Sequence, residues 1–169
     1  MDSASADSPD AVDGVIEAWH RERPDLDLTA IAAAGRLGRL SLLLGPAQEK
    51  VFTTFGLQRG EFDVLAALRR SGEPYIQSPS QLSQLLMLSR AGMTNRLDRL
   101  EKAEFVERTL DPGDRRSFQI RLTERGYATV DTAMTEHTAN VTRLLSALDD
   151  QELGTLDDLL RKLLRGLSG

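Results

Sequence analysis

The sequence predicts a mainly α-helical fold with one small β-hairpin. Apolar residues recur at steps of three and four along most of the 169 residues, which is the period of helices that bury one face. One stretch, residues 105–122, changes to the alternation of β-strands around a strong turn signal. The content of 40% hydrophobic and 28% charged residues is that of an ordinary soluble domain, and the length suits a single compact core.

The N-terminal part of the chain is predicted to be helical. Residues 1–11, rich in Ser, Asp and Ala, form a flexible tail, and a short helix follows from Val12 to about Arg23, before Pro24. A recurring apolar face predicts a long amphipathic helix that closes at Gly56 and that Pro46 should bend. This face comprises Leu37, Leu40, Leu44, Ala47, Val51 and Phe55.

A third helix, from about Gln58 to Arg70, is apolar on nearly every side. This pattern is typical of a helix buried among others, so we expect it to lie centrally. Asp63 interrupts the apolar pattern, and a buried carboxylate needs a partner. We therefore expect Asp63 to be buried and to face a cation.

Two closely spaced helices are predicted after a stub of strand at residues 75–77. Ser78 caps the first, from Pro79 to Leu86, and proline is favoured at a first helical position. Ser89 caps the second, residues 90–103. The inward face of the second helix comprises Met93, Leu97 and Leu100. Two helices joined this tightly form a helix-turn-helix.

A β-hairpin follows directly. Residues 111–114, Asp-Pro-Gly-Asp, form the turn, and Phe118, Ile120 and Leu122 then alternate with polar residues. A helix-turn-helix followed by a hairpin is a winged helix, in which the second helix enters the major groove of DNA and the hairpin reaches the neighbouring backbone or minor groove. We predict this winged helix-turn-helix for residues 57–122.

Two further helices complete the predicted fold. One begins at Thr123, and a capping box of Asp149 with Glu152 opens the other. The last helix has more leucine than one packed face requires, which indicates pairing with a second copy of the chain. We predict that residues 12–56 and 123–169 form the long terminal helices of a homodimer. One reading helix per subunit then predicts an inverted-repeat operator.

Basic residues gather in the middle region. Between Arg90 and Arg121 eight basic residues stand against six acidic ones, although the whole chain has a net charge of −5. A local positive surface suits docking to double-stranded DNA at one place only. The candidate DNA-binding residues lie on the outward face of the second helix and in the hairpin tip. They are Ser89, Arg90, Ala91, Thr94, Asn95, Arg99, Asp114, Arg115 and Arg116.

The chemistry of these side chains suits a groove. Asn95 can pair with adenine, Arg99 with guanine or phosphate, and Thr94 with phosphate, while Ala91 allows a close approach. Two arginines beside the turn could enter a narrow minor groove, with Asp114 orienting Arg116. The alternatives are a solvated helix face and a charged turn that keeps a sheet edge soluble.

Three parts of the sequence resemble the MarR family of bacterial-type transcriptional regulators. They are Ser89–Glu101, the wing segments Val106–Arg108 and Asp111–Arg116, and Leu122–Gly126, in matching order and spacing. The resemblance covers nearly the whole chain. It implies a dimeric repressor whose affinity for DNA falls when a small anion binds.

Trp19, with residues 60–65 and 93–96, is similar to the urate-responsive, PecS-like branch of that family. In that branch a tryptophan, an aspartate and two arginines bind the ligand. The matching positions here are Trp19, Asp63, Arg96 and Arg108. A sister group that answers citrate and aconitate is also similar, and a phenolic ligand is a further alternative. From the residues alone, Trp19 could serve packing, Asp63 could pair with an arginine for structure, and Arg108 could contact phosphate.

Other classes of protein find little support. The sequence has no glycine-rich phosphate loop and no cysteine, and His20 and His137 are too far apart in sequence to suggest a metal site, so we expect no enzyme, cofactor or metal. A helical interaction module that binds no DNA remains an alternative, but it leaves the arginine-rich hairpin unexplained. No apolar run has the length of a membrane span and the N-terminus lacks signal-peptide features, so we expect a cytoplasmic protein without a membrane partner.

Overall fold

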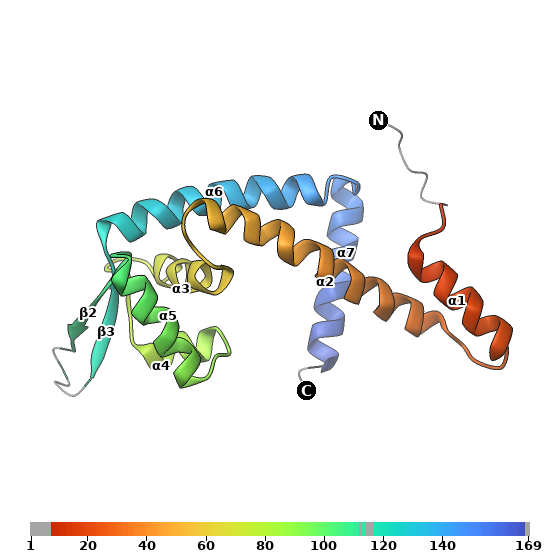
Figure 1. Ribbon diagram of the computed structural model, residues 1–169, viewed down its shortest axis with the longest axis horizontal. Helices are drawn as coiled ribbons and strands as arrows, with labels where there is room; N and C mark the ends of the chain where they lie inside the picture. Colours follow the sequence, from red (N-terminus) through yellow and green to blue (C-terminus); the bar gives the residue numbers. More distant parts are fainter. Residues whose placement is uncertain (1–7, 112, 114–116, 168–169) are drawn as a thin grey trace. The chain divides into compact units, whose positions relative to one another are not determined.

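The computed structural model describes residues 8–111, 113 and 117–167. These residues form seven helices and a three-stranded antiparallel sheet (Figure 1). The expected fold class, mainly α with a small hairpin, is therefore confirmed. Contacts divide the chain into two compact units, residues 1–47 and 48–169. No helix in the described ranges is long and apolar enough to cross a membrane.

The first unit contains α1 (Ala11–Glu22) and most of α2 (Thr29–Thr54). Asp10 caps α1 by accepting the backbone N–H groups of Val12 and Asp13 at 2.6 and 3.1 Å. Arg36 of α2 joins the two helices, since it donates to Asp10 at 2.8 Å and to Asp13 at 2.5 Å. Among the described residues of this unit, Leu28 is the hydrophobic side chain that is buried. The unit therefore has almost no core of its own.

The start of α2 lies earlier than the sequence pattern predicted. The predicted apolar face began at Leu37, but the helix begins at Thr29, whose N–H donates to the Asp27 carboxylate at 3.0 Å. Four of the eight intervening residues, 29–36, are alanine, which favours helix by propensity without marking an apolar face. The helix also continues through Pro46.

In the second unit, α3 (Arg59–Arg70) has the central place expected for it. It packs against α4 (Pro79–Leu85), α5 (Arg90–Lys102), α6 (Glu124–Leu144) and strand β3 (Phe118–Leu122). Its side chains Val64, Leu65, Ala67 and Leu68 are at most 1% exposed. They form the core of the unit with residues of the neighbouring helices and of the sheet.

The sheet joins the helix-turn-helix to this core. Its order is β1 (Ile76–Gln77), β3, β2 (Val106–Leu110), and both pairings are antiparallel. Before β1, the Arg69 guanidinium lies against the rings of Tyr75 and Tyr127, at 5.3 and 4.5 Å from their centres. Arg69 also pairs with Asp131 of α6 at 2.7 Å. The strand is therefore fastened to both α3 and α6.

The predicted helix starts in this unit are confirmed. Ser78 caps α4 and Ser89 caps α5, whose Gly92 N–H donates to the Ser89 hydroxyl at 3.1 Å. The capping box of Asp149 and Glu152 opens α7 (Asp150–Leu167), with reciprocal hydrogen bonds of 2.9 and 2.8 Å.

The first turn of α6 requires a glycine. Thr123 caps this helix by accepting the N–H of Gly126 at 2.9 Å. A Cβ atom at Gly126 would lie 1.9 Å from the Phe105 carbonyl oxygen, so the helix start can approach the backbone before β2 only without a side chain.

Candidate functional site

The recognition helix α5 has two distinct faces. Met93, Leu97 and Leu100 are at most 2% exposed and join the core, as the sequence predicted. The predicted DNA-binding residues on this helix and at its cap are all exposed; they are Ser89, Arg90, Ala91, Thr94, Asn95 and Arg99. Figure 1 shows α5 beside α4, with the hairpin next to it. Helix α5 thus offers an exposed, mainly polar face for a groove.

The hairpin tip falls partly outside the described residues. The predicted wing residues Asp114, Arg115 and Arg116 belong to that part, so the structure is silent on them. The last described strand pair before the tip is Leu110 with Phe118, and both side chains are more than half exposed. The described strands therefore bring two apolar side chains to the base of the predicted wing.

A hydroxyl-lined depression of about 310 Å³ lies between α4, α5 and the start of β3. Its polar lining consists of Ser78, Ser80, Ser83, Arg90, Thr94 and Ser117. Hydroxyl and guanidinium groups together suit a phosphate of a nucleic-acid backbone. The serines at the start of α4 were not predicted as site residues, although a serine-rich helix start shortly before Arg90 and Thr94 in the sequence was a signal that could have identified them.

Arg108 of β2 is engaged by two carboxylates of α5. Its guanidinium lies 2.5 Å from an oxygen of Asp98 and 2.5 Å from an oxygen of Glu101, which are one helical turn apart. The side chain is only 27% exposed. Arg108 therefore fastens the hairpin to the recognition helix. Any further anion must compete with these two carboxylates for it.

Arg96 contrasts with Arg108. Its guanidinium rests on the first turn of α3, with a long hydrogen bond of 3.4 Å to the Gly60 carbonyl. A Cβ atom at Gly60 would lie 2.5 Å from the Arg96 Cζ, so the glycine makes room for the guanidinium. Among the described residues no carboxylate forms an ion pair with Arg96. A partly buried guanidinium without an anionic partner is suited to receive an anion.

The expected burial of Asp63 was wrong. Asp63 is only partly buried, and it forms no ion pair with another described residue. The reason is the stripe Arg59, Asp63, Ala66 and Arg70, which recurs at steps of four, three and four and is the less covered side of α3. Because Ala66 is apolar, the sequence pattern did not show this stripe as a polar face.

The charge of Asp63 is nevertheless sensitive to its surroundings. Burial raises the pKa of the Asp63 carboxyl above its usual value, while the positive charges of Arg59 and Arg96 oppose this effect. The positive charge of Arg96 therefore acts on Asp63 without an ion pair between them, whereas Arg108 has Asp98 and Glu101 as ion-pair partners.

The buried carboxylate of α3 is Glu61, which the sequence analysis missed. Glu61 is 6% exposed and is the charged residue that is buried in the described part of the chain. One of its oxygens accepts the Gln58 N–H at 2.8 Å, and the other lies 2.7 Å from Nε of Arg99. The spacing of Gln58 and Glu61 resembles a capping box and was the available signal.

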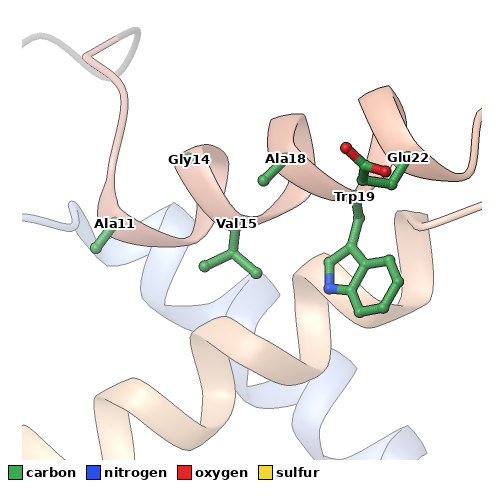
Figure 2. Close-up of a pocket in the computed structure, with 6 residues that line it drawn as sticks. All are labelled: Ala11, Gly14, Val15, Ala18, Trp19 and Glu22. Atoms are coloured by element: carbon green, nitrogen blue, oxygen red, sulfur yellow. The ribbon is translucent and has the colours of Figure 1, made fainter.

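Trp19 lies on α1, in the first unit. It is 50% exposed and lines a shallow depression of about 440 Å³. All six lining residues belong to one face of this helix; they are Ala11, Gly14, Val15, Ala18, Trp19 and Glu22 (Figure 2). Figure 2 shows the side chains of Val15 and Trp19 on the same side of α1. The face is apolar enough to pack against another surface or a planar ligand.

One further group in the second unit has an unusual environment. The His137 ring of α6 lies 5.0 Å from the ring centre of Phe52 and 5.6 Å from that of Phe62. Its Nδ1 atom is buried and has no hydrogen-bond partner among the described atoms. Burial lowers the pKa of the His137 imidazole below its usual value, and the charge of Arg59 acts in the same direction.

Comparison with known proteins places this arrangement among DNA-binding regulators. A model described as MarR family matches residues 55–117. The chain is similar to the HTH-type transcriptional regulator PecS of Dickeya dadantii (strain 3937), with 43% identity over 149 residues that cover 88% of this chain and 90% of that protein.

Solved structures agree with the sequence comparison. AbsC, a MarR family transcriptional regulator from Streptomyces coelicolor, matches with a TM-score of 0.76 and 28% identity over 85% of this chain and 97% of that one. A mutant of MarR from Escherichia coli, solved with operator DNA, matches with a TM-score of 0.70 and 25% identity over 81% of this chain and 97% of that one. These proteins are regulators, so the prediction that the chain is not an enzyme is confirmed.

Proposed function

The chain belongs to the MarR family of DNA-binding transcriptional regulators, and from this premise we propose that it binds an inverted-repeat operator as a homodimer and that a small anion releases it. The observation that carries the proposal is the exposed polar face of α5 over a fully buried apolar face. Residues 57–122 form the DNA-binding region in this proposal. The protein acts as a repressor in the cytoplasm.

The terminal regions, residues 12–56 and 123–169, provide the proposed dimer contacts. Helix α7 leaves Leu163, Leu164 and Leu167 exposed at 51%, 65% and 84%, and α2 leaves Leu42 exposed at 76%. Apolar faces this large are costly in water, and pairing with a second copy removes them from solvent. Two copies of α5 then read half-sites about 34 to 36 Å apart.

The DNA part of the proposal is tested with the full chain and a random duplex library. Selection of bound duplexes should yield a motif with two-fold symmetry, and sedimentation should give twice the 18.6 kDa mass of one chain. A monomer at micromolar concentration, or a selected motif without two-fold symmetry, would contradict the proposal.

The ligand part of the proposal is supported by the guanidinium of Arg96. An anion that bound Arg96 would be repelled by the Asp63 carboxylate, so it would push α3 and α5 apart. If Arg108 also turned to the ligand, Asp98 and Glu101 would lose their partner and the hairpin would loosen from α5. Trp19 offers a planar surface for an aromatic anion. Urate is the first candidate, with citrate or aconitate next.

Derepression needs only a modest free energy of coupling between ligand binding and DNA binding. A coupling of about 1 to 3 kcal/mol lowers the affinity for DNA about 5- to 150-fold, and DNA then weakens ligand binding by the same factor. Arg96→Ala should keep operator affinity and lose the response to urate. The proposal fails if this variant responds like the wild type, or if urate, citrate and aconitate at millimolar concentration neither shift the melting temperature nor release DNA.

A further inference from the structure

The buried carboxylate of Glu61 has no role in the proposed function so far. It lies in the first turn of α3, and its two oxygens have different partners. One oxygen accepts the Gln58 N–H at 2.8 Å and so completes the start of the helix. The other lies 2.7 Å from Nε of Arg99, on the recognition helix. The same carboxylate therefore links the central helix to the proposed reading face.

Arg99 differs from its ion-pair partner in exposure. Its side chain is 51% exposed, whereas that of Glu61 is 8% exposed. A guanidinium has five N–H donors on three nitrogens, and the ion-pair contact with Glu61 is made at Nε. The four hydrogens on the two terminal nitrogens are the ones used in bidentate contacts to guanine or phosphate. Arg99 can thus keep its ion pair and contact DNA at the same time.

The pair should persist when DNA binds. If Arg99 left Glu61, a carboxylate that is almost fully buried would remain without its cationic partner, which is strongly unfavourable. Arg96, one turn earlier on α5, also rests on the first turn of α3 through Gly60. The start of α3 therefore forms a common support for two of the three arginines of α5, Arg96 and Arg99.

We propose that Glu61 is a positioning residue for DNA recognition, which holds Arg99 in the orientation that contacts the operator. The inference rests on the proposed use of α5 as the recognition helix. A free arginine loses side-chain freedom when it binds DNA, whereas Arg99 has already lost it in the ion pair. Glu61 therefore raises operator affinity without touching DNA.

A double-mutant cycle tests the proposal on the selected operator. Glu61→Gln keeps an oxygen that can accept the Gln58 N–H but removes the charge that holds Arg99. We expect this variant to bind the operator about 2- to 10-fold more weakly in fluorescence anisotropy. We expect Arg99→Ala to bind more weakly still, and Glu61→Gln to have no further effect in the Arg99→Ala background.

A matched control separates positioning from general charge. Glu104→Gln removes the same charge from an exposed side chain that pairs with Arg125 rather than Arg99, and it should not weaken operator binding. The proposal is overturned if Glu61→Gln weakens binding equally in both backgrounds, leaves it unchanged or strengthens it. If Arg99→Ala itself binds like the wild type at all salt concentrations, the assignment of Arg99 to the reading face fails instead.

A measurement on the wild-type protein covers the case in which Glu61→Gln does not fold. The side-chain carboxyl carbon resonance of Glu61 should move in Arg99→Ala, which lacks the ion-pair partner, and should keep its wild-type position when the wild-type protein binds the operator. A move on DNA binding toward the position seen in Arg99→Ala would show that the ion pair breaks, and it would overturn the proposal.

Discussion

Replacing Gly60 by alanine should disable the response to ligand without unfolding the protein. The added Cβ would lie 2.5 to 2.8 Å from Cζ, Nη2 and Nε of Arg96. Because unstrained contacts between such atoms need about 3.5 to 4.0 Å, the guanidinium must withdraw by about 1 Å. The obstacle is the end of a flexible side chain, so the backbone of α3 and α5 can stay in place.

The energies predict a change in function rather than in stability. Alanine favours helix over glycine by up to about 1 kcal/mol, and the hydrogen bond lost from Arg96 to the Gly60 carbonyl is long, at 3.4 Å. The free energy of unfolding should therefore change by less than about 1 kcal/mol. A charged hydrogen bond to the ligand is worth about 1.5 to 3 kcal/mol, so urate binding should weaken about 10- to 150-fold.

The assay measures release of a fluorescent operator during titration with urate, alongside the melting temperature. Arg96→Ala is the matched control, because it removes the same guanidinium by another route and should give the same loss. Gly154→Ala adds a methyl group in α7 where no side chain of the same chain lies within 4 Å, and it should leave the response intact as long as sedimentation gives the same mass as for the wild type. A Gly60→Ala protein that releases DNA at the wild-type urate concentration would refute the reasoning.

Three further predictions concern stability and DNA contact. Gly126→Ala should lower the free energy of unfolding by about 3 kcal/mol or more, because its Cβ would lie 1.9 Å from the Phe105 carbonyl oxygen and the backbone must move. Asn95→Ala should lose about 1 to 3 kcal/mol of preference at one base pair, whereas Arg116→Ala should weaken all sites and reduce the salt slope by about 1. The pKa of His137 is lowered in the folded protein, so the unfolded chain binds the proton more readily, and the free energy of unfolding should fall as pH drops below about 6.5.

Each of these predictions has a direct check. Chemical denaturation at fixed protein concentration should give Gly126→Ala a much lower free energy of unfolding than Gly154→Ala. Equal free energies would contradict the close approach of the α6 start to the Phe105 backbone. If Arg116→Ala binds DNA with unchanged affinity and salt dependence, the hairpin does not contact DNA. For His137→Gln, the loss of stability between pH 7 and 5 should shrink. Asp63 has the opposite effect on the free energy of unfolding. Its pKa is raised in the folded protein, so the folded protein binds this proton more readily than the unfolded chain and gains stability as the pH falls.

Local sequence signals predicted much of the fold. Ser78, Ser89 and Asp149 began their helices as expected, and the inward and outward faces of α5 followed from the helical period alone. These features depend on neighbours within a few residues of the chain. That is why periodicity and capping rules were sufficient for them.

The candidate site was less accessible to such rules. The sequence pattern selected Asp63 as the buried carboxylate of α3, but Glu61 is buried instead, because Arg99 pairs with it from 38 residues further along the chain. The two carboxylates that hold Arg108 were likewise assigned no role, since their partner lies on a strand that follows their helix. Ion pairs between elements depend on how the elements pack, and one chain's pattern of polar residues does not specify that packing.

The exposed position of Trp19 also makes its intrinsic fluorescence a probe of what binds to α1. It is the single tryptophan of the chain, so emission excited beyond the tyrosine band comes from the α1 face alone. The two tyrosines, Tyr75 and Tyr127, lie 5.2 Å apart around Arg69 in the other unit. Unlabelled protein therefore carries one chromophore in the N-terminal helices and a separate pair beside β1. Stopped-flow recordings of the Trp19 emission can time the arrival of an aromatic anion at α1.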